Sequence, residues 1–162
     1  MTMPSRVLSV TIASGPAAER TAAGIWARAT ALRDSLPEVA PVEDKLLGIQ
    51  HALHAEGGSL HLATSGTRAG GFAVVVPHGE TSEIRYLATD PSLWGGGIAT
   101  ALLDHVRAHA LATGASAMEL WVIADNERAV QTYERAGWTA TAEVEVRHAG
   151  GRPERRYVRA AD

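Results

Sequence analysis

Three consecutive glycines, residues 95–97, separate a strand-like segment, residues 83–89, from a helix-like segment that begins at Ile98. Glycines bury no side chain and raise the entropy cost of ordering the backbone, so packing does not explain such a run. They leave backbone N–H groups accessible beside the positive end of a helix dipole. The junction therefore predicts an anion site, and a phosphate or pyrophosphate is the expected ligand.

The composition limits the classes of protein to which the chain can belong. Its 162 residues suit one domain, residues 1–162, and 46% of them are hydrophobic, enough for a core. The net charge of −3 argues against nucleic acid or an anionic membrane surface as a partner. The absence of cysteine excludes disulfides, thiolate metal sites and cysteine nucleophiles. With no apolar run of membrane-spanning length and no secretory signal, we expect a cytoplasmic protein.

Hydrophobic periodicity and turn residues predict an alternating series of strands and helices. The predicted strands cover residues 7–12, 59–64, 71–76, 83–89, 117–123, 138–146 and 155–158, and the predicted helices cover residues 17–36, 42–55, 98–113 and 127–136. The order is one strand, two helices, three strands, a helix, a strand, a helix and two strands. This order predicts one mixed α/β domain with parallel and antiparallel neighbours.

Three phosphate-binding patterns can be compared with the glycine segment. A P-loop requires a Gly-Lys pair followed by Ser or Thr, and the chain has none at that spacing. A dinucleotide fingerprint, G-x-G-x-x-G, fits at Gly95 and Gly97 but has Thr100 at its third position, and it lies too far along a small domain. The coenzyme A pattern [Q/R]-x-x-G-x-[G/A] fits at Gly97 and Ala99 and departs at Trp94.

Further motifs around this loop resemble the GNAT superfamily of N-acetyltransferases. Residues 87–91 resemble its L-x-V-x-P strand end, residues 98–103 its G-I-G-x-x-L-L helix start, and residues 126–138 its N-x-x-A-x-x-x-Y-x-x-x-G-F segment. The motifs occur in the family's order and cover about residues 83–138. The resemblance implies a single-domain GNAT fold, a mixed sheet of about six or seven strands with about four helices, and acetyl-CoA as cosubstrate.

The resemblance also implies which residues bind the coenzyme. Backbone amides of the loop would bind its pyrophosphate, and these belong to Trp94, Gly95, Gly96, Gly97, Ile98, Ala99 and Thr100. Trp94 stands where the family has Gln or Arg, and an indole has one donor and no charge. We therefore expect the backbone contact to remain and the side chain of Trp94 to pack over the loop or the adenine side.

Two further coenzyme contacts follow from the same resemblance. Leu87, Ala88 and Thr89 would pair through their backbone with the pantetheine arm, as an added strand does; the alternative is an ordinary strand edge. Asn126 would make a polar contact to the coenzyme. Its alternative role is that of a helix N-cap, which Asn favours, and the two roles are compatible.

Two residues are candidate catalytic groups. In the resemblance, Tyr133 lies near the thioester sulfur, where a phenol can give the leaving thiolate a proton or hydrogen bond; the alternative is core packing. Glu83 would deprotonate the amine through water, as in the protein-lysine branch with its E-x-x-x-L-x-V strand. Glu83 has the strand parity of Leu87 and Thr89, so we expect it to face the same side. Its alternative role is that of a solvated carboxylate.

Two histidine pairs, His51 with His54 and His105 with His109, have helical spacings that can chelate a metal. Neither pair has a third ligand with a recognisable motif, so we interpret both as solvated helix faces and expect no metal.

The function implied by the resemblance is direct transfer of an acetyl group from acetyl-CoA to a primary amine of a small molecule or peptide, in a ternary complex. The alternative is a non-catalytic acyl-CoA-binding or regulatory module on the same fold. Glu83 and Tyr133 favour the enzyme. The acceptor would be shaped by residues 26–44 and 145–157, which carry no motif, and a homodimer is a further possibility.

Overall fold

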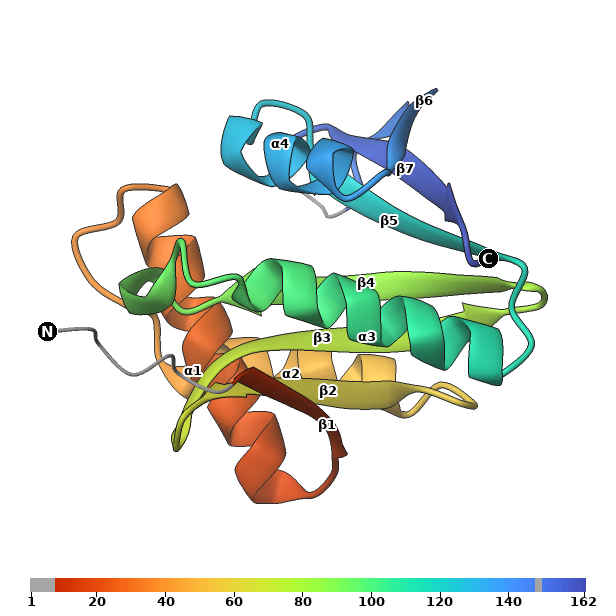
Figure 1. Ribbon diagram of the computed structural model, residues 1–162. Coiled ribbons are helices and arrows are strands. Elements are labelled where there is room, and N and C mark those ends of the chain that lie inside the picture. The colour runs from red at the N-terminus through yellow and green to blue at the C-terminus, as the bar shows by residue number, and fades with distance from the viewer. Residues whose placement is uncertain (1–7, 148–149) are drawn as a thin grey trace, which may run out of the picture.

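The computed structural model describes residues 8–147 and 150–162 (Figure 1). The strands are β1 (Leu8–Ala13), β2 (Ser59–Ser65), β3 (Arg68–His78), β4 (Thr81–Thr89), β5 (Ala117–Ile123), β6 (Thr139–Glu145) and β7 (Glu154–Ala160). The helices are α1 (Pro16–Arg33), α2 (Val42–Leu53), α3 (Ile98–Ala112) and α4 (Glu127–Arg135), with a 3-10 turn at Pro91–Leu93. The predicted element order is confirmed; Val7, predicted to begin the first strand, lies outside the described residues.

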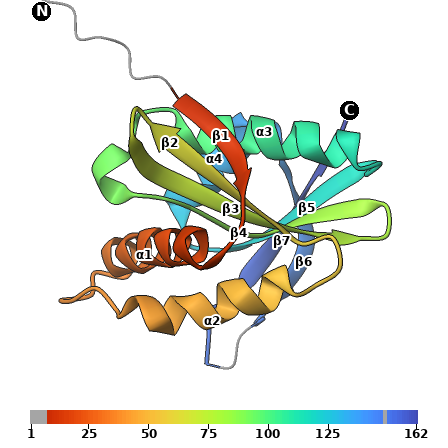
Figure 2. The same cartoon turned by 90° about the horizontal axis from the view of Figure 1, so that it is seen from below.

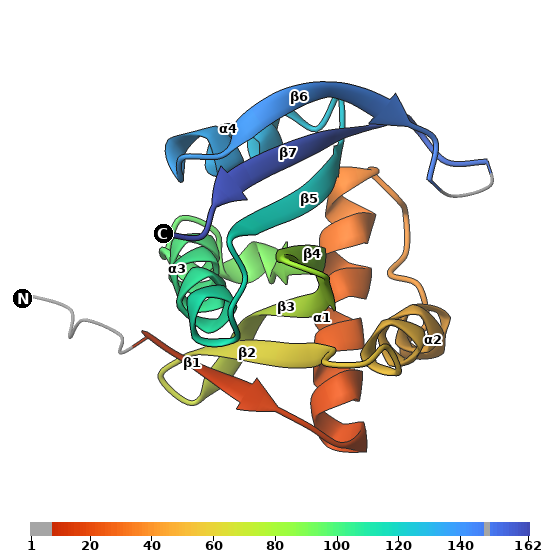
Figure 3. The same cartoon turned by 90° about the vertical axis from the view of Figure 1, so that its right-hand side faces the viewer.

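The strands form one mixed sheet in the order β1-β2-β3-β4-β5-β7-β6. The β4–β5 pair is parallel, and the other neighbours are antiparallel. Helices α1 and α2 cover one face of the sheet, and α3 and α4 lie on the other (Figure 2 and Figure 3). This seven-stranded sheet with four helices confirms the predicted fold class.

The sheet separates two hydrophobic core clusters. One cluster joins the sheet to α3 through residues such as Leu102, Val106 and Leu120. The other joins it to α1 and α2 through residues such as Ile25 and Ile49. Strand β3 lies between them and sends alternate side chains into both clusters, which explains why it is buried over most of its length.

Two glycines of β3 allow the start of α3 to approach the sheet closely. A Cβ atom on Gly71 would lie 2.6 Å from Cγ2 of Ile98, and one on Gly70 would lie 2.6 Å from Cδ1 of Leu93. Such contacts are shorter than packed side chains tolerate. The absent side chains therefore bring the glycine loop and the first turn of α3 against β3.

Strands β4 and β5 separate along part of their length. Their pairing runs from Thr81 with Ala117 to Ile84 with Leu120. Beyond that pair β4 continues beside β3 as far as Thr89, while β5 continues beside β7 as far as Ile123. Figure 1 shows the two strands diverging, so a gap opens in the middle of the sheet.

A β-bulge in β4 lies at the point where this gap begins. Tyr86 pairs with Val74, but Ile84 pairs with Val75, so Arg85 is an extra residue in the strand. An extra residue reverses the alternation of side chains between the two faces of a sheet. Side chains of β4 before Arg85 therefore face opposite to what a regular strand would give.

The bulge makes one sequence prediction wrong. Glu83 is opposite Val76, which belongs to the core cluster of α1 and α2, whereas Leu87 packs in the cluster of α3. Residues directly opposite each other in an antiparallel pair share a face. Glu83 thus faces the α1 and α2 side, and it does not share the face of Leu87 and Thr89.

Candidate functional site

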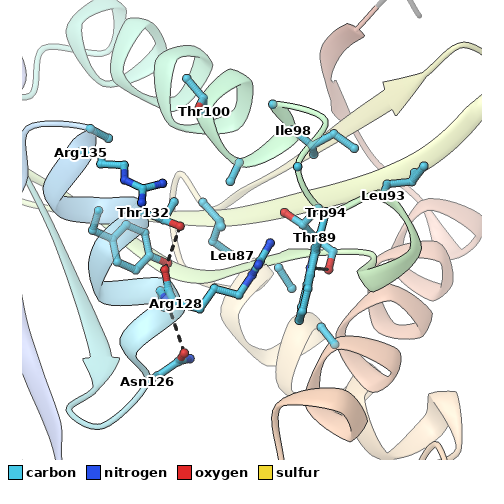
Figure 4. Close-up of a pocket in the computed structure, with 18 of the residues that line it drawn as sticks. Leu87, Thr89, Leu93, Trp94, Ile98, Thr100, Asn126, Arg128, Thr132 and Arg135 are labelled. Atoms are coloured by element: carbon cyan, nitrogen blue, oxygen red, sulfur yellow. Dashed lines mark hydrogen bonds between the residues drawn. The ribbon is translucent and has the colours of Figure 1, made fainter.

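A cavity of about 790 Å³ lies between α4 and the part of β4 that has separated from β5 (Figure 4). Its walls come from α1, the end of β4, the glycine loop, the first half of α3, the length of α4 and Arg159 of β7. The predicted site residues that line it are Leu87, Ala88, Thr89, Trp94, Gly95, Gly97, Ile98, Ala99, Thr100, Asn126 and Tyr133. Gly96 borders an adjoining hollow on the other side of the loop, and Glu83 lines neither.

The loop begins at Asp90, whose carboxylate is 2% exposed. It accepts hydrogen bonds from the Ser92 amide (3.0 Å) and hydroxyl (2.8 Å), and Nη2 of Arg28 lies 2.9 Å from its Oδ2. Burial raises the pKa of the Asp90 carboxyl, but the Ser92 and Arg28 contacts outweigh it and hold that pKa below its ordinary value. Asp90 therefore holds the loop to α1 as an ionised group.

Gly95 and Gly97 have φ angles of +83° and +81°, in the region that residues with side chains rarely adopt. Gly97 is the N-cap of α3, and its carbonyl accepts the first helical hydrogen bond, from Ala101 at 3.0 Å. The amides of the first helical turn, before Ala101, have no partner within the helix. Within the loop, the amides of Trp94 and Gly96 donate to the carbonyls of Pro91 and Leu93, each at 3.3 Å. The amides of Gly95 and Gly97, the first turn of α3 and its helix dipole thus provide what an anion site requires.

The side chain of Trp94 is fixed on two sides. Its Nε1–H donates to the Thr89 carbonyl at 3.2 Å, and the Arg128 guanidinium lies 3.7 Å from the centre of the ring. The sequence predicted packing alone, so the hydrogen bond is an addition. Sequence reasoning did not identify Arg128: its place after Asn126 in the matched segment is the one available signal, and nothing in the pattern indicates contact with Trp94.

The charge around the cavity is mainly positive. Four arginines, Arg33, Arg128, Arg135 and Arg159, line it together with the carboxylate of Asp104. A concave surface dominated by one sign of charge attracts ligands of the opposite sign. The cavity therefore suits an anionic ligand, in agreement with the loop geometry.

Two α4 residues reach the cavity from its far wall. The Oδ1 atom of Asn126 accepts a hydrogen bond from the Ala129 amide at 3.3 Å, which confirms the predicted N-cap. Tyr133 is 8% exposed, and its ring lies 6.2 Å from that of Trp138. Burial raises the pKa of the Tyr133 phenol to about 12, so it stays protonated. Its hydroxyl has no hydrogen-bond partner within the described chain.

Glu83 lies at the end of the paired part of β4, on the opposite face of the sheet. It is 4% exposed, so the interpretation as a solvated carboxylate is wrong. Arg85 forms a fork with both carboxylate oxygens, at 3.1 and 3.2 Å, and His78 Nε2 lies 2.7 Å from Oε2. Arg147 Nη2 is 3.4 Å from Oε1. A buried carboxylate requires such partners.

The face that holds Glu83 also holds the segments predicted to shape the acceptor site. Trp26 stacks on Tyr86 with ring centres 4.4 Å apart, and burial raises the pKa of that tyrosine. Asp34, at the end of α1, accepts a 2.7 Å hydrogen bond from Arg152 of the β6–β7 connection. The two predicted acceptor segments, 26–44 and 145–157, therefore meet in the structure.

A histidine cluster lies away from the cavity, between β2 and α3. The ring of His61, which is fully buried, lies 5.0 Å from His105 and 4.8 Å from His109. His105 and His109 are half-buried, so the prediction of a solvated helix face is correct for them only in part. His51 and His54 are exposed as predicted. Within residues 8–147 and 150–162, no group of three or more His, Cys, Asp or Glu side chains is arranged to hold a metal.

Among residues 8–147 and 150–162, none of the helices combines the length and the apolar composition of a membrane-spanning segment.

Residues 26–138 of the chain match the sequence profile of the acetyltransferase (GNAT) family. Mycothiol acetyltransferase of Propionibacterium freudenreichii is 38% identical over 73 residues, which cover 45% of this chain and 23% of that protein. The match therefore spans about a quarter of that relative's length.

Solved structures share the fold at low identity. The ribosomal-protein-S18-alanine N-acetyltransferase of Escherichia coli has a TM-score of 0.72 at 16% identity, over 96% of this chain and 95% of that chain. A Salmonella typhimurium protein solved with its cofactor acetyl-CoA has a TM-score of 0.68 at 16% identity, over 96% and 94% of the two chains.

Proposed function

Because the chain belongs to the GNAT family of acetyltransferases, we propose that it transfers the acetyl group of acetyl-CoA to a primary amine, directly and in a ternary complex. The observation that carries the proposal is the cavity at the gap in the sheet, with the glycine loop on one wall and Tyr133 on another. We further propose that residues 1–162 form a single catalytic domain.

The residues around the cavity fit acetyl-CoA. The loop and the first turn of α3 offer amides for a pyrophosphate, and the arginines supply positive charge. Beyond Ile84, β4 has no β5 partner, so its edge can pair with an extended arm such as pantetheine. We assign these contacts to Leu87, Ala88, Thr89, Asn126 and residues 94–100. When bound, acetyl-CoA supplies an activated thioester for attack by the amine.

Tyr133 serves in this proposal as the hydrogen-bond or proton donor to the departing thiolate. Its hydroxyl is protonated over the whole physiological range, since the pKa is raised to about 12. No described residue forms a hydrogen bond with this hydroxyl, so it is available to a group in the cavity. A positioned donor of this kind contributes about 10²–10⁴-fold to a rate.

Glu83 serves as the proton acceptor for the amine, acting through water from the opposite side of the sheet. Its position at the last paired residues of β4 and β5 supports this role, because the amine can approach the gap from the α1 and α2 face. His78, about half exposed and 2.7 Å from the carboxylate, connects Glu83 to solvent. The proton can leave along this pair.

The acceptor in this proposal is a primary amine of a small molecule or a peptide. Two relatives support the range: one is named for mycothiol and another for an alanine of a ribosomal protein. The Asp34–Arg152 pair closes one end of the acceptor face and would limit how bulky an acceptor can be.

The test measures free thiol released from acetyl-CoA over a panel of small amines, amino acids and short peptides, with calorimetric binding of acetyl-CoA in parallel. Release with at least one amine supports the enzyme. Binding without release for any amine supports the non-catalytic module instead. Failure to bind acetyl-CoA contradicts both.

A further inference from the structure

Arg128 is placed where a helix gains least from a cation. It is the second residue of α4, and a positive charge in a first turn opposes the helix dipole. Its guanidinium lies 3.7 Å from the centre of the Trp94 ring, and Arg128 takes part in none of the ion pairs among the described residues. An exposed arginine in this position, without a carboxylate partner, is not explained by helix stability.

The other arginines of the cavity have local explanations. Arg33 pairs with Asp34. Arg159 donates to the carbonyl of Ala136. Arg135 lies in the last turn of α4, where a cation is favourable. Arg128 is therefore the cavity arginine whose placement calls for a ligand.

Trp94 holds Arg128 in one place. The indole is fixed by its hydrogen bond to the Thr89 carbonyl, 3.2 Å long, so its face is a rigid platform. A guanidinium stacked on an aromatic face keeps its N–H groups free at the edges of its plane. Figure 4 shows Arg128 extending from α4 toward Trp94, across the cavity.

The stacked pair places hydrogen-bond donors for an anion on the side of the cavity opposite the glycine loop. Trp94, Gly95 and Gly97 line the same cavity, and the first turn of α3 follows directly. The loop contributes amides on one side, and Arg128 contributes charged donors from α4 on the other. Charged donors make shorter and stronger hydrogen bonds to phosphate than neutral amides do.

We propose that Arg128, stacked on Trp94, binds the pyrophosphate of the acyl donor from the α4 side, opposite the glycine loop. This assignment rests on the proposed function. Trp94 then acts as a positioning residue, and the charge that its side chain lacks is supplied by another element of the fold. The site would select donors that carry a pyrophosphate over donors that end at pantetheine.

The experiment compares Arg128→Ala with the parent protein, using acetyl-CoA and S-acetylpantetheine, which has no phosphate. Calorimetry measures the binding of acetyl-CoA, and shifts of the indole NMR signals measure the binding of S-acetylpantetheine. Arg20→Ala, which removes the same charge from the distant α1–α2 pair with Glu43, is the control. We expect Arg128→Ala to weaken the binding of acetyl-CoA about tenfold to hundredfold and to make this binding less dependent on salt. The affinity for S-acetylpantetheine should not change.

Each outcome has a distinct meaning. An unchanged dissociation constant for acetyl-CoA in Arg128→Ala overturns the inference, as does an equal loss for both ligands, which indicates a structural role. An equal loss in Arg20→Ala also overturns it, because the effect is then one of net charge. If the parent binds S-acetylpantetheine but not acetyl-CoA, the proposed donor is wrong, and the inference fails with it.

Discussion

The two buried ionisable groups at the gap, Tyr133 and Glu83, are treated in opposite ways by the fold. Tyr133 lies on the α3 and α4 side, is neutral, and has a hydroxyl without a protein partner. Glu83 lies on the α1 and α2 side and contacts Arg85, Arg147 and His78. A neutral phenol can be buried at small cost, whereas an isolated carboxylate cannot. The hydroxyl of Tyr133 is therefore free for a ligand, whereas the carboxylate of Glu83 is enclosed by two guanidiniums and an imidazole.

This difference predicts how the two sites respond to substitution. Removing the Tyr133 hydroxyl takes away a functional group that supports no other protein group. Removing the Glu83 charge leaves two guanidiniums and an imidazole facing one another around a buried position. Substitution of Tyr133 should therefore reduce turnover without reducing the free energy of unfolding. Substitution of Glu83 should reduce both.

The largest effect is expected for Glu83→Gln. Turnover should fall about 10³-fold through loss of the proton acceptor. The free energy of unfolding should fall by about 1–3 kcal/mol, because the guanidiniums lose the opposite charge that stabilises them. The loss stays in this range because these guanidiniums are partly exposed and can be hydrated instead. Steady-state kinetics across pH and urea denaturation measure the two quantities.

The control for this substitution is Glu80→Gln, which makes the same chemical change at the exposed β3–β4 turn. It should alter stability by no more than about 0.5 kcal/mol. Normal turnover in Glu83→Gln would remove Glu83 from the mechanism, whatever happens to stability.

The histidine cluster extends the comparison to a second buried neutral group. Burial lowers the pKa of His61 from 6.5 to about 4, with smaller contributions from His109 and His105. The unfolded chain therefore binds more protons than the folded one between pH 6.5 and pH 4, and stability should fall as the pH falls through this window. At about 1.4 kcal/mol per unit, the loss is about 3 kcal/mol.

Urea denaturation at pH 7 and at pH 4 measures this loss, and His61→Phe should reduce it. The exposed His54→Gln is the matched control and should leave the pH dependence as in the parent. The same acid sensitivity in His61→Phe as in the parent would show that His61 is not the buried neutral group responsible.

The smallest of the three effects is expected for Tyr133→Phe, and it should be confined to catalysis. Turnover should fall about 10²-fold, equivalent to about 2.7 kcal/mol in the transition state. The free energy of unfolding should change by less than about 0.5 kcal/mol, because no hydrogen bond of the protein is lost. Tyr157→Phe, a buried tyrosine that does not line the cavity, is the control. A large loss of stability in Tyr133→Phe would contradict the comparison.

Sequence reasoning predicted most residues that line the cavity but not the face on which Glu83 lies, for physical reasons. The glycine loop, Asn126 and Tyr133 belong to one continuous stretch whose spacing is set by backbone geometry, and such spacing is visible in a sequence. The face of Glu83 depends on one unpaired residue, Arg85, and alternation of residue types does not reveal a bulge. Contacts between distant segments, such as Arg128 with Trp94, leave no periodic pattern.

The bulge at Arg85 also has a consequence for how this strand tolerates insertions and deletions. In most strands a one-residue deletion is damaging because it turns core side chains outward. Here deletion of Arg85 would give a regular strand in which residue 83 still pairs with Val76 and its carboxylate stays on the α1 and α2 face. The strand could therefore lose this residue without turning core side chains outward, and Glu83 would lose the two hydrogen bonds from Arg85 but keep its face.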